Sequence, residues 1–103
     1  MPYKLRFVQK FNLAKTREFL EIEKQFAAFE EQYPEFPKGN RYLPLSGREP
    51  ANTLVWECDF ETLEELHKAH QFLMDDNRHE DLFMVQSEFM LDNYTEIYKP
   101  YDA

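Results

Sequence analysis

Apolar and polar residues alternate along three segments of the chain, and a period of two residues predicts β-strands. The middle segment is rich in β-branched and aromatic residues, so it is the one most typical of a central strand. A shorter strand is predicted at residues 41–46, where Pro44 lacks a backbone N–H and therefore indicates an edge position. The three alternating segments are Tyr3–Phe11, Thr53–Phe60 and Tyr94–Tyr98.

Between these segments the apolar residues recur every three or four positions, which predicts amphipathic helices. Asn12 or Thr16 is suited to cap the first helix, and Pro34 ends it. Thr62 and Glu65 have the spacing of a capping box at the start of the second helix. A third helix is predicted after Asn77, unless that stretch is an irregular connection. The apolar stripes are Phe19, Ile22, Phe26, Phe29 and Tyr33 in the first helix, Leu63, Leu66 and Leu73 in the second, and Leu82, Val85 and Phe89 in the third.

The order of elements is β-α-β-β-α-α-β, which is the split βαβ arrangement of the ferredoxin-like fold. We therefore predict one α+β domain over residues 1–103, with a four-stranded antiparallel sheet and the helices on one face. The first and third strands would be central and the other two would be edges. The helix-covered face would carry Leu5, Phe7, Leu54, Trp56 and Cys58, and the only cysteine is thus expected to be a buried core residue.

The opposite face of this sheet has no predicted cover, although it mixes apolar and polar residues. A layer of this kind has to be covered. A second copy of the same sheet is the simplest cover, which predicts a two-fold symmetric homodimer. The residues expected to line a ligand cavity between the two sheets are Arg6, Val8, Tyr42, Val55, Glu57, Tyr94 and Tyr98.

Arg6 and Glu57 should meet across neighbouring strands on this open face. Inside a dimer cavity, such an ion pair would have perturbed protonation, which is a frequent mark of a functional site. The simpler interpretation is an ordinary cross-strand salt bridge, because structural ion pairs perturb protonation as well. Tyr42, Tyr94 and Tyr98 are equally suited to line the cavity or to form dimer contacts.

The charge of the chain limits its partners. It has 12 Lys and Arg against 20 Asp and Glu, a formal net charge of −8. An acidic chain repels phosphate backbones and anionic lipids, so neither nucleic acid nor a membrane is an expected partner. No apolar run has the form of a signal peptide or the length of a membrane span, which gives a cytoplasmic location as the default. The acidic runs Glu30–Glu31 and Glu61–Glu65 are expected to be solvated helix faces.

The element order, the segment Leu54–Leu66 (LVWECDFETLEEL) and the closing strand Thr95–Tyr98 resemble the dimeric α/β-barrel superfamily. That superfamily includes NIPSNAP-like proteins and antibiotic-biosynthesis-monooxygenase-like domains. The resemblance implies a barrel-like homodimer with two sheets face to face, but no single activity. Three functions stay open: binding of a small organic ligand between the sheets, a cofactor-free monooxygenase-type enzyme, and a structural dimer with no pocket.

The haem-degrading members of this superfamily use an Asn on the first strand, together with a Trp and a haem-ligating His in the second half. Here the first strand has Gln9 and the single Trp56 lies on a strand. The position one turn into the second helix holds Leu66 and His67 instead of Trp. His70 or His79 could supply an imidazole, but the set is incomplete and no cofactor is expected.

Glu64, His67 and His70 stand at i, i+3 and i+6 of one predicted helix, so adjacent pairs could reach one metal ion. The spacing differs from the His-Glu-x-x-His zinc signature. The simpler interpretation is that His67 is exposed and His70 is partly buried beside the apolar stripe. No metal site is therefore predicted.

Overall fold

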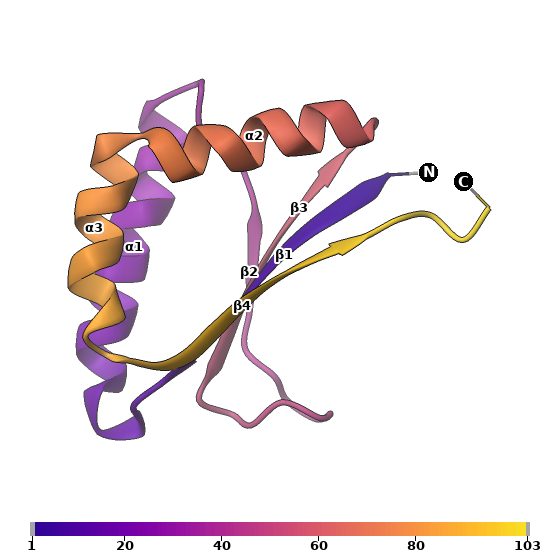
Figure 1. Ribbon diagram of the computed structural model, residues 1–103. Coiled ribbons are helices and arrows are strands. Elements are labelled where there is room, and N and C mark those ends of the chain that lie inside the picture. The colour runs from indigo at the N-terminus through magenta and orange to yellow at the C-terminus, as the bar shows by residue number, and fades with distance from the viewer. Residues whose placement is uncertain (1, 103) are drawn as a thin grey trace.

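The computed structural model describes residues 2–102 and shows one antiparallel sheet of four strands with helices on one of its faces (Figure 1). The strand order is β2-β3-β1-β4, so the first and third strands are central. The predicted ferredoxin-like α+β fold is thereby confirmed. In chain order, the elements are β1 (Tyr3–Phe11), η1 (Leu13–Lys15), α1 (Thr16–Gln32), β2 (Asn40–Tyr42), β3 (Thr53–Phe60), α2 (Leu63–Asp75), α3 (Asn77–Ser87) and β4 (Met90–Tyr98).

The register of β1 against β3 fixes which side chains share a face. Phe7 lies beside Trp56, and Leu5 lies beside Cys58. Because side chains alternate along a strand, these four residues point to the same side. Leu5, Trp56 and Cys58 form one buried cluster with Leu66 and Leu73 of α2, so the predicted helix-covered face is confirmed.

The helix layer has two parts. α2 packs directly on β1 and β3, whereas α1 packs mainly against α3. Figure 1 shows α1 and α3 side by side, with α2 crossing above them toward the far ends of the strands. No helix within residues 2–102 is long and apolar enough to cross a membrane.

Two predicted helix boundaries are corrected and a third is confirmed. Asn12 caps the short helix η1 by accepting a hydrogen bond from the Ala14 amide, and α1 begins only at Thr16. Asp76 caps α3 by accepting from the amides of Arg78 and His79. Thr62 accepts from the Glu65 amide, as the predicted capping box requires.

The inner face of α3 also differs from the predicted stripe. Val85 is 46% exposed, whereas the neighbouring Gln86 is completely buried. The side-chain amide of Gln86 donates to Glu23 Oε1 at 2.9 Å. This hydrogen bond gives the buried amide nitrogen a partner, so the polar side chain can lie in the core. Phe89 lies beyond Ser87, where the helix ends, and packs with Phe11 instead.

The strand β2 is shorter than predicted. It runs from Asn40 to Tyr42, and Pro44 lies beyond its end in an irregular segment. A proline cannot donate to the ladder, so pairing stops before it. β2 and β4 are the two edges of the sheet, as the position of Pro44 indicates.

Candidate functional site

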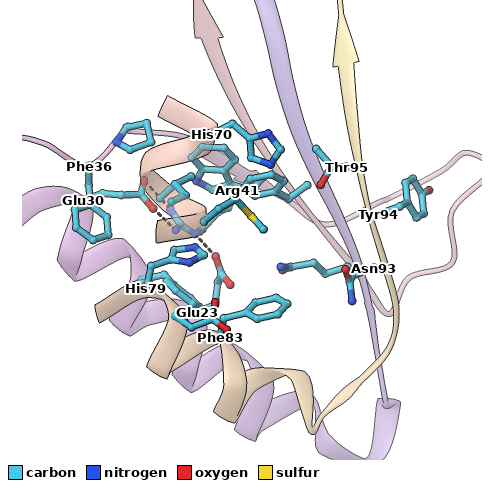
Figure 2. A pocket seen from close by; sticks show the side chains of 18 residues that line it. Glu23, Glu30, Phe36, Arg41, His70, His79, Phe83, Asn93, Tyr94 and Thr95 are labelled. Atoms are coloured by element: carbon cyan, nitrogen blue, oxygen red, sulfur yellow. Dashed lines mark hydrogen bonds and ion pairs between the residues drawn. The ribbon is translucent and has the colours of Figure 1, made fainter. Parts of the chain in front are cut away.

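A cavity of about 300 Å³ lies between the sheet and the helices (Figure 2). Its inner wall is apolar and buried, and aromatic side chains dominate it. Its rim is exposed and more polar. The inner wall includes Phe26, Phe36, Trp56 and Leu73, and the rim includes Met74, Glu80, Asn93 and Thr95. An apolar hollow with a few polar groups at its edge is the usual form of a small-molecule site.

The strands supply neutral polar groups to the rim of this cavity. Gln9 of β1 lies beside Asn93 of β4, and Phe7 lies beside Thr95. Figure 2 shows Asn93 and Thr95 on β4 across the cavity from His79 and Phe83 of α3. The side-chain amides of Gln9 and Asn93 each offer donors and an acceptor, so this part of the rim can match several hydrogen-bonding groups.

One arginine joins β2 to α1 beside the cavity. Arg41 Nε donates to Glu23 Oε2 at 2.6 Å, and its Nη2 donates to Glu30 Oε2. Both glutamate side chains are about nine-tenths buried, at 10% and 11% exposure. Burial alone would lower the pKa of Arg41, but its hydrogen bonds to Glu30 and Glu23 outweigh that effect and raise it. The cluster is therefore a charged, mutually paired unit.

Gly39 brings the strand β2 close to the cavity wall. Its amide donates to Glu30 Oε1 at 2.9 Å. A Cβ atom at this position would lie 2.2 Å from the indole ring of Trp56, which is far inside contact distance. Only glycine fits here, and the close approach holds Trp56 against the loop that precedes β2.

His79 projects from the first turn of α3 to line the cavity. Its ring lies 5.0 Å from that of Phe26 and is nearly parallel to that of Phe83, at an angle of 8°. Burial lowers the pKa of His79, and the nearby carboxylates of Glu80, Asp76 and Glu30 only partly oppose this. The imidazole is therefore neutral near pH 7.

The seven residues predicted to line an inter-sheet cavity lie on the opposite face of the sheet, which no helix covers. Arg6 Nε donates to Glu57 Oε2 at 2.8 Å, so the two residues do meet across β1 and β3. Arg6 Nη1 also donates to Glu96 Oε1 and to the Tyr98 hydroxyl, each at 2.9 Å. The structure thus brings Arg6, Glu57 and Tyr98 together. Their role as ligand contacts stays a prediction.

Val8, Val55 and Tyr42 form the apolar part of the same face. Val8 pairs with Val55 across β1 and β3, and both are buried within one chain. Tyr42 lies beside Val55 at the sheet edge and is 53% exposed.

The loop after β2 reaches toward this open face through Glu49. The Tyr94 hydroxyl donates to Glu49 Oε1 at 2.5 Å, and Lys10 approaches Glu49 at 3.5 Å. This hydrogen bond raises the pKa of Tyr94 to about 12. In Figure 2, Tyr94 points away from the helix-side cavity. A second, more polar hollow of about 630 Å³ lies on the open face beside Arg6, Lys10 and Tyr94.

The remaining candidates are the predicted cluster on α2 and the cysteine. Within residues 2–102, no three His, Cys, Asp or Glu side chains are placed to hold a metal ion. Glu64 pairs with Lys68, and His67 is exposed. Cys58 is buried, as predicted, and burial raises the pKa of its thiol to about 11. A protonated buried thiol is inert.

The charged cluster beside the cavity is not among the sites expected from the sequence. Glu30 is expected there on a solvated face, but it is buried. The buried positions of α1 are Phe19, Glu23, Phe26 and Glu30, which follow the spacing of a core-facing stripe. Two carboxylates in phase with two phenylalanines were the signal for a buried cation.

Comparisons with known proteins agree on the fold class. No protein-family model matches the sequence, and no curated protein matches it either. A NIPSNAP family protein from Agrobacterium tumefaciens has a TM-score of 0.77 at 14% identity, covering 99% of this chain and 95% of that one. A second NIPSNAP family protein from that organism, with unknown function, has a TM-score of 0.73 at 16% identity, covering 96% of this chain and 87% of that one.

An antibiotic biosynthesis monooxygenase also shares the fold, with a TM-score of 0.73 at 8% identity and coverage of 95% of this chain and 97% of that one. The resemblance to NIPSNAP-like and antibiotic-biosynthesis-monooxygenase-like domains is thereby confirmed at the level of the fold. At these identities the likeness carries no information about activity.

Proposed function

We propose that this chain binds a small, mostly apolar organic molecule in the cavity between the sheet and the helices. The observation that supports this most is the cavity itself, about 300 Å³ of space against a buried aromatic wall. A water molecule takes about 30 Å³ in the liquid, so the cavity has the volume of roughly ten waters. That volume suits a ligand at the small end of the range for protein pockets.

Naphthalene is a suitable first probe because it is apolar and small enough to fit in this volume. We expect it to raise the midpoint of thermal unfolding, since a ligand of the native state stabilises it by mass action. Thr95→Trp should abolish the shift by filling the rim from an exposed edge strand. Ile97→Trp is the matched control, because Ile97 is two residues further along β4 and outside the cavity lining. No shift with the wild type, or an equal shift in both variants, would refute the proposal.

The open face is proposed as the interface with a second copy of the chain. Its exposed tyrosines, Tyr42 at 53% and Tyr98 at 47%, give it large aromatic surface, next to the Arg6 ion pairs. A ligand between the two sheets, on the seven predicted residues, stays a prediction that is compatible with this dimer.

Sedimentation at micromolar concentration tests the interface. We expect a dimer of the 12.6 kDa chain. Tyr42→Asp should give monomers, because it places a charge in an apolar contact. Met84→Asp is the control, since Met84 is similarly exposed at 59% but lies on α3. A monomeric wild type would contradict the proposal.

A cofactor-free monooxygenase-type reaction is the second candidate function. The observation that favours it is the combination of a buried aromatic wall with polar groups at the rim, which would position a substrate for oxygen. Oxygen consumption in the presence of a bound ligand would support it. Binding with no oxygen uptake would leave the chain as a binding protein.

A further inference from the structure

The ring nitrogens of His79 differ in their surroundings. Within residues 2–102, three buried side-chain polar atoms have no hydrogen-bond partner: Thr53 Oγ1, Gln86 Oε1 and His79 Nδ1. Of these three residues, only His79 lines the helix-side cavity. Its Nδ1 is closed off from solvent, so Nε2 is the nitrogen left to meet a ligand.

This asymmetry determines where the imidazole carries its proton. A buried N–H without a partner is rarer in proteins than a buried acceptor without one. A proton on Nδ1 would create such an orphan donor, whereas a proton on Nε2 leaves only an unused lone pair. Protonation of both nitrogens would also bury an unpaired N–H. His79 is therefore a neutral donor through Nε2–H.

The charges around the cavity restrict the ligand further. Titratable and charged groups surround His79 from several elements. They are Glu80 of α3, Asp76 at the N-cap of α3, Glu23 and Glu30 of α1, Arg41 of β2 and His70 of α2. Arg41 is the only Arg or Lys among the described lining residues, and its guanidinium is already paired with the carboxylates of Glu23 and Glu30. An anionic ligand would thus enter an apolar site with no free cation, at a large desolvation cost.

We propose that the cavity selects a neutral carbonyl compound, whose oxygen accepts a hydrogen bond from Nε2–H of His79. This inference rests on the proposed function of the cavity and names the ligand class. The aromatic wall would hold the apolar part of the molecule. A neutral imidazole at the start of a helix polarises a carbonyl without transferring a proton to it. His79 thus sets specificity and takes no part as a base.

Three ligands with one skeleton separate this inference from the proposed function. They are 2-acetylnaphthalene, which has a neutral carbonyl, 2-ethylnaphthalene, which has none, and 2-naphthoate, which is an anion. We expect the ketone to bind roughly three- to tenfold more tightly than the hydrocarbon, as one neutral hydrogen bond provides. The carboxylate should bind most weakly. Equal binding of ketone and hydrocarbon would overturn the inference and leave the proposed function standing, whereas no binding by any of them would overturn both.

Two variants assign the preference to His79. His79→Phe keeps an aromatic ring but removes the donor, so the preference for the ketone should disappear. His79→Gln supplies a side-chain amide donor and should restore part of it. His67→Phe, on the exposed face of α2, is the matched control and should retain it in full. A preference that survives in His79→Phe would contradict the assignment.

The tautomer can be measured without any ligand. Long-range ¹H–¹⁵N spectra of the histidine-labelled protein distinguish a proton on Nε2 from one on Nδ1. We expect the pattern of the Nε2–H tautomer for His79 at pH 7. An Nδ1–H tautomer or an imidazolium would overturn the inference, even in a protein that binds naphthalene.

Discussion

Each face of the sheet carries one arginine held between two glutamates, and the two clusters differ in what they connect. On the covered face, Arg41 joins a strand to Glu23 and Glu30 of a helix. On the open face, Arg6 joins three neighbouring strands through Glu57 and Glu96. The carboxylates of the first cluster are 10% and 11% exposed, against 20% and 35% in the second.

That difference in burial decides what each cluster can do. A buried carboxylate without its partner keeps the full cost of desolvation, whereas an exposed one is stabilised again by water. The Arg41 cluster therefore fixes tertiary structure around the cavity. The Arg6 cluster lies where a second chain could still rearrange it, which suits an interface more than a preformed site.

The largest expected effect is the loss of Arg41. Arg41→Leu would leave Glu23 and Glu30 buried without a cation, and should lower the free energy of unfolding by about 3 kcal/mol. Arg6→Leu should lower it by about 1 kcal/mol or less, because its partners are more exposed. Urea unfolding at a concentration that keeps the chain monomeric measures both.

The control restores neutrality on the covered face. Replacing Glu23, Glu30 and Arg41 together by Gln, Gln and Leu should recover part of the stability, since no charge remains buried. Equal losses for the two single arginine variants would show that burial does not separate the two faces as described.

The second effect concerns the close approach of Gly39 to Trp56. A Cβ atom there would be 2.2 Å from a rigid, buried ring, so Gly39→Ala should cost about 2 kcal/mol in unfolding free energy. Trp56 fluorescence should also change, because the ring has to move. Lys38→Ala, at the adjacent exposed position, should change neither quantity. An unchanged unfolding free energy in Gly39→Ala would show that this wall of the cavity is loosely packed.

The fold could be predicted from the sequence because its signals are local. The alternation in Thr53–Phe60, the capping box at Thr62 and the break at Asp75–Asn77 each depend on a few neighbouring residues. The order of strands then follows from the small number of ways to connect such elements. Even the meeting of Arg6 and Glu57 follows from strand pairing alone.

The helix-side cavity could not be predicted in the same way. It is lined by residues of all three helices and of the strands, so it depends on how the helix layer packs over the sheet, and such packing is not encoded in any short segment. The sequence showed Gln86 as a polar residue beside the apolar Val85, and only its amide contact with Glu23 explains why Gln86 is the buried one. Polar core residues of this kind break the hydrophobic period that the prediction uses.

The smallest expected effect is a pH dependence of stability that only the covered face should produce, through His79. The pKa of His79 lies below its ordinary value of 6.5 in the folded chain because the ring is buried. As the pH falls through 6.5, the unfolded chain binds a proton that the folded chain does not, so stability should fall, by at most about 1.4 kcal/mol per pH unit. The loss should end once the pH drops below the folded pKa.

His79→Phe should remove this pH dependence of the unfolding free energy between pH 7 and 5, and His67→Gln should keep it. The carboxylates with lowered pKa, such as Asp76 and Glu49, titrate in the unfolded chain near 3.8 and 4.5 and therefore act below this window. The open face has no histidine, so its variants should leave the slope unchanged. An equal slope in His79→Phe would mean that the His79 ring of the wild type is not desolvated. The covered face would then have no buried titratable group of this kind to distinguish it from the open face.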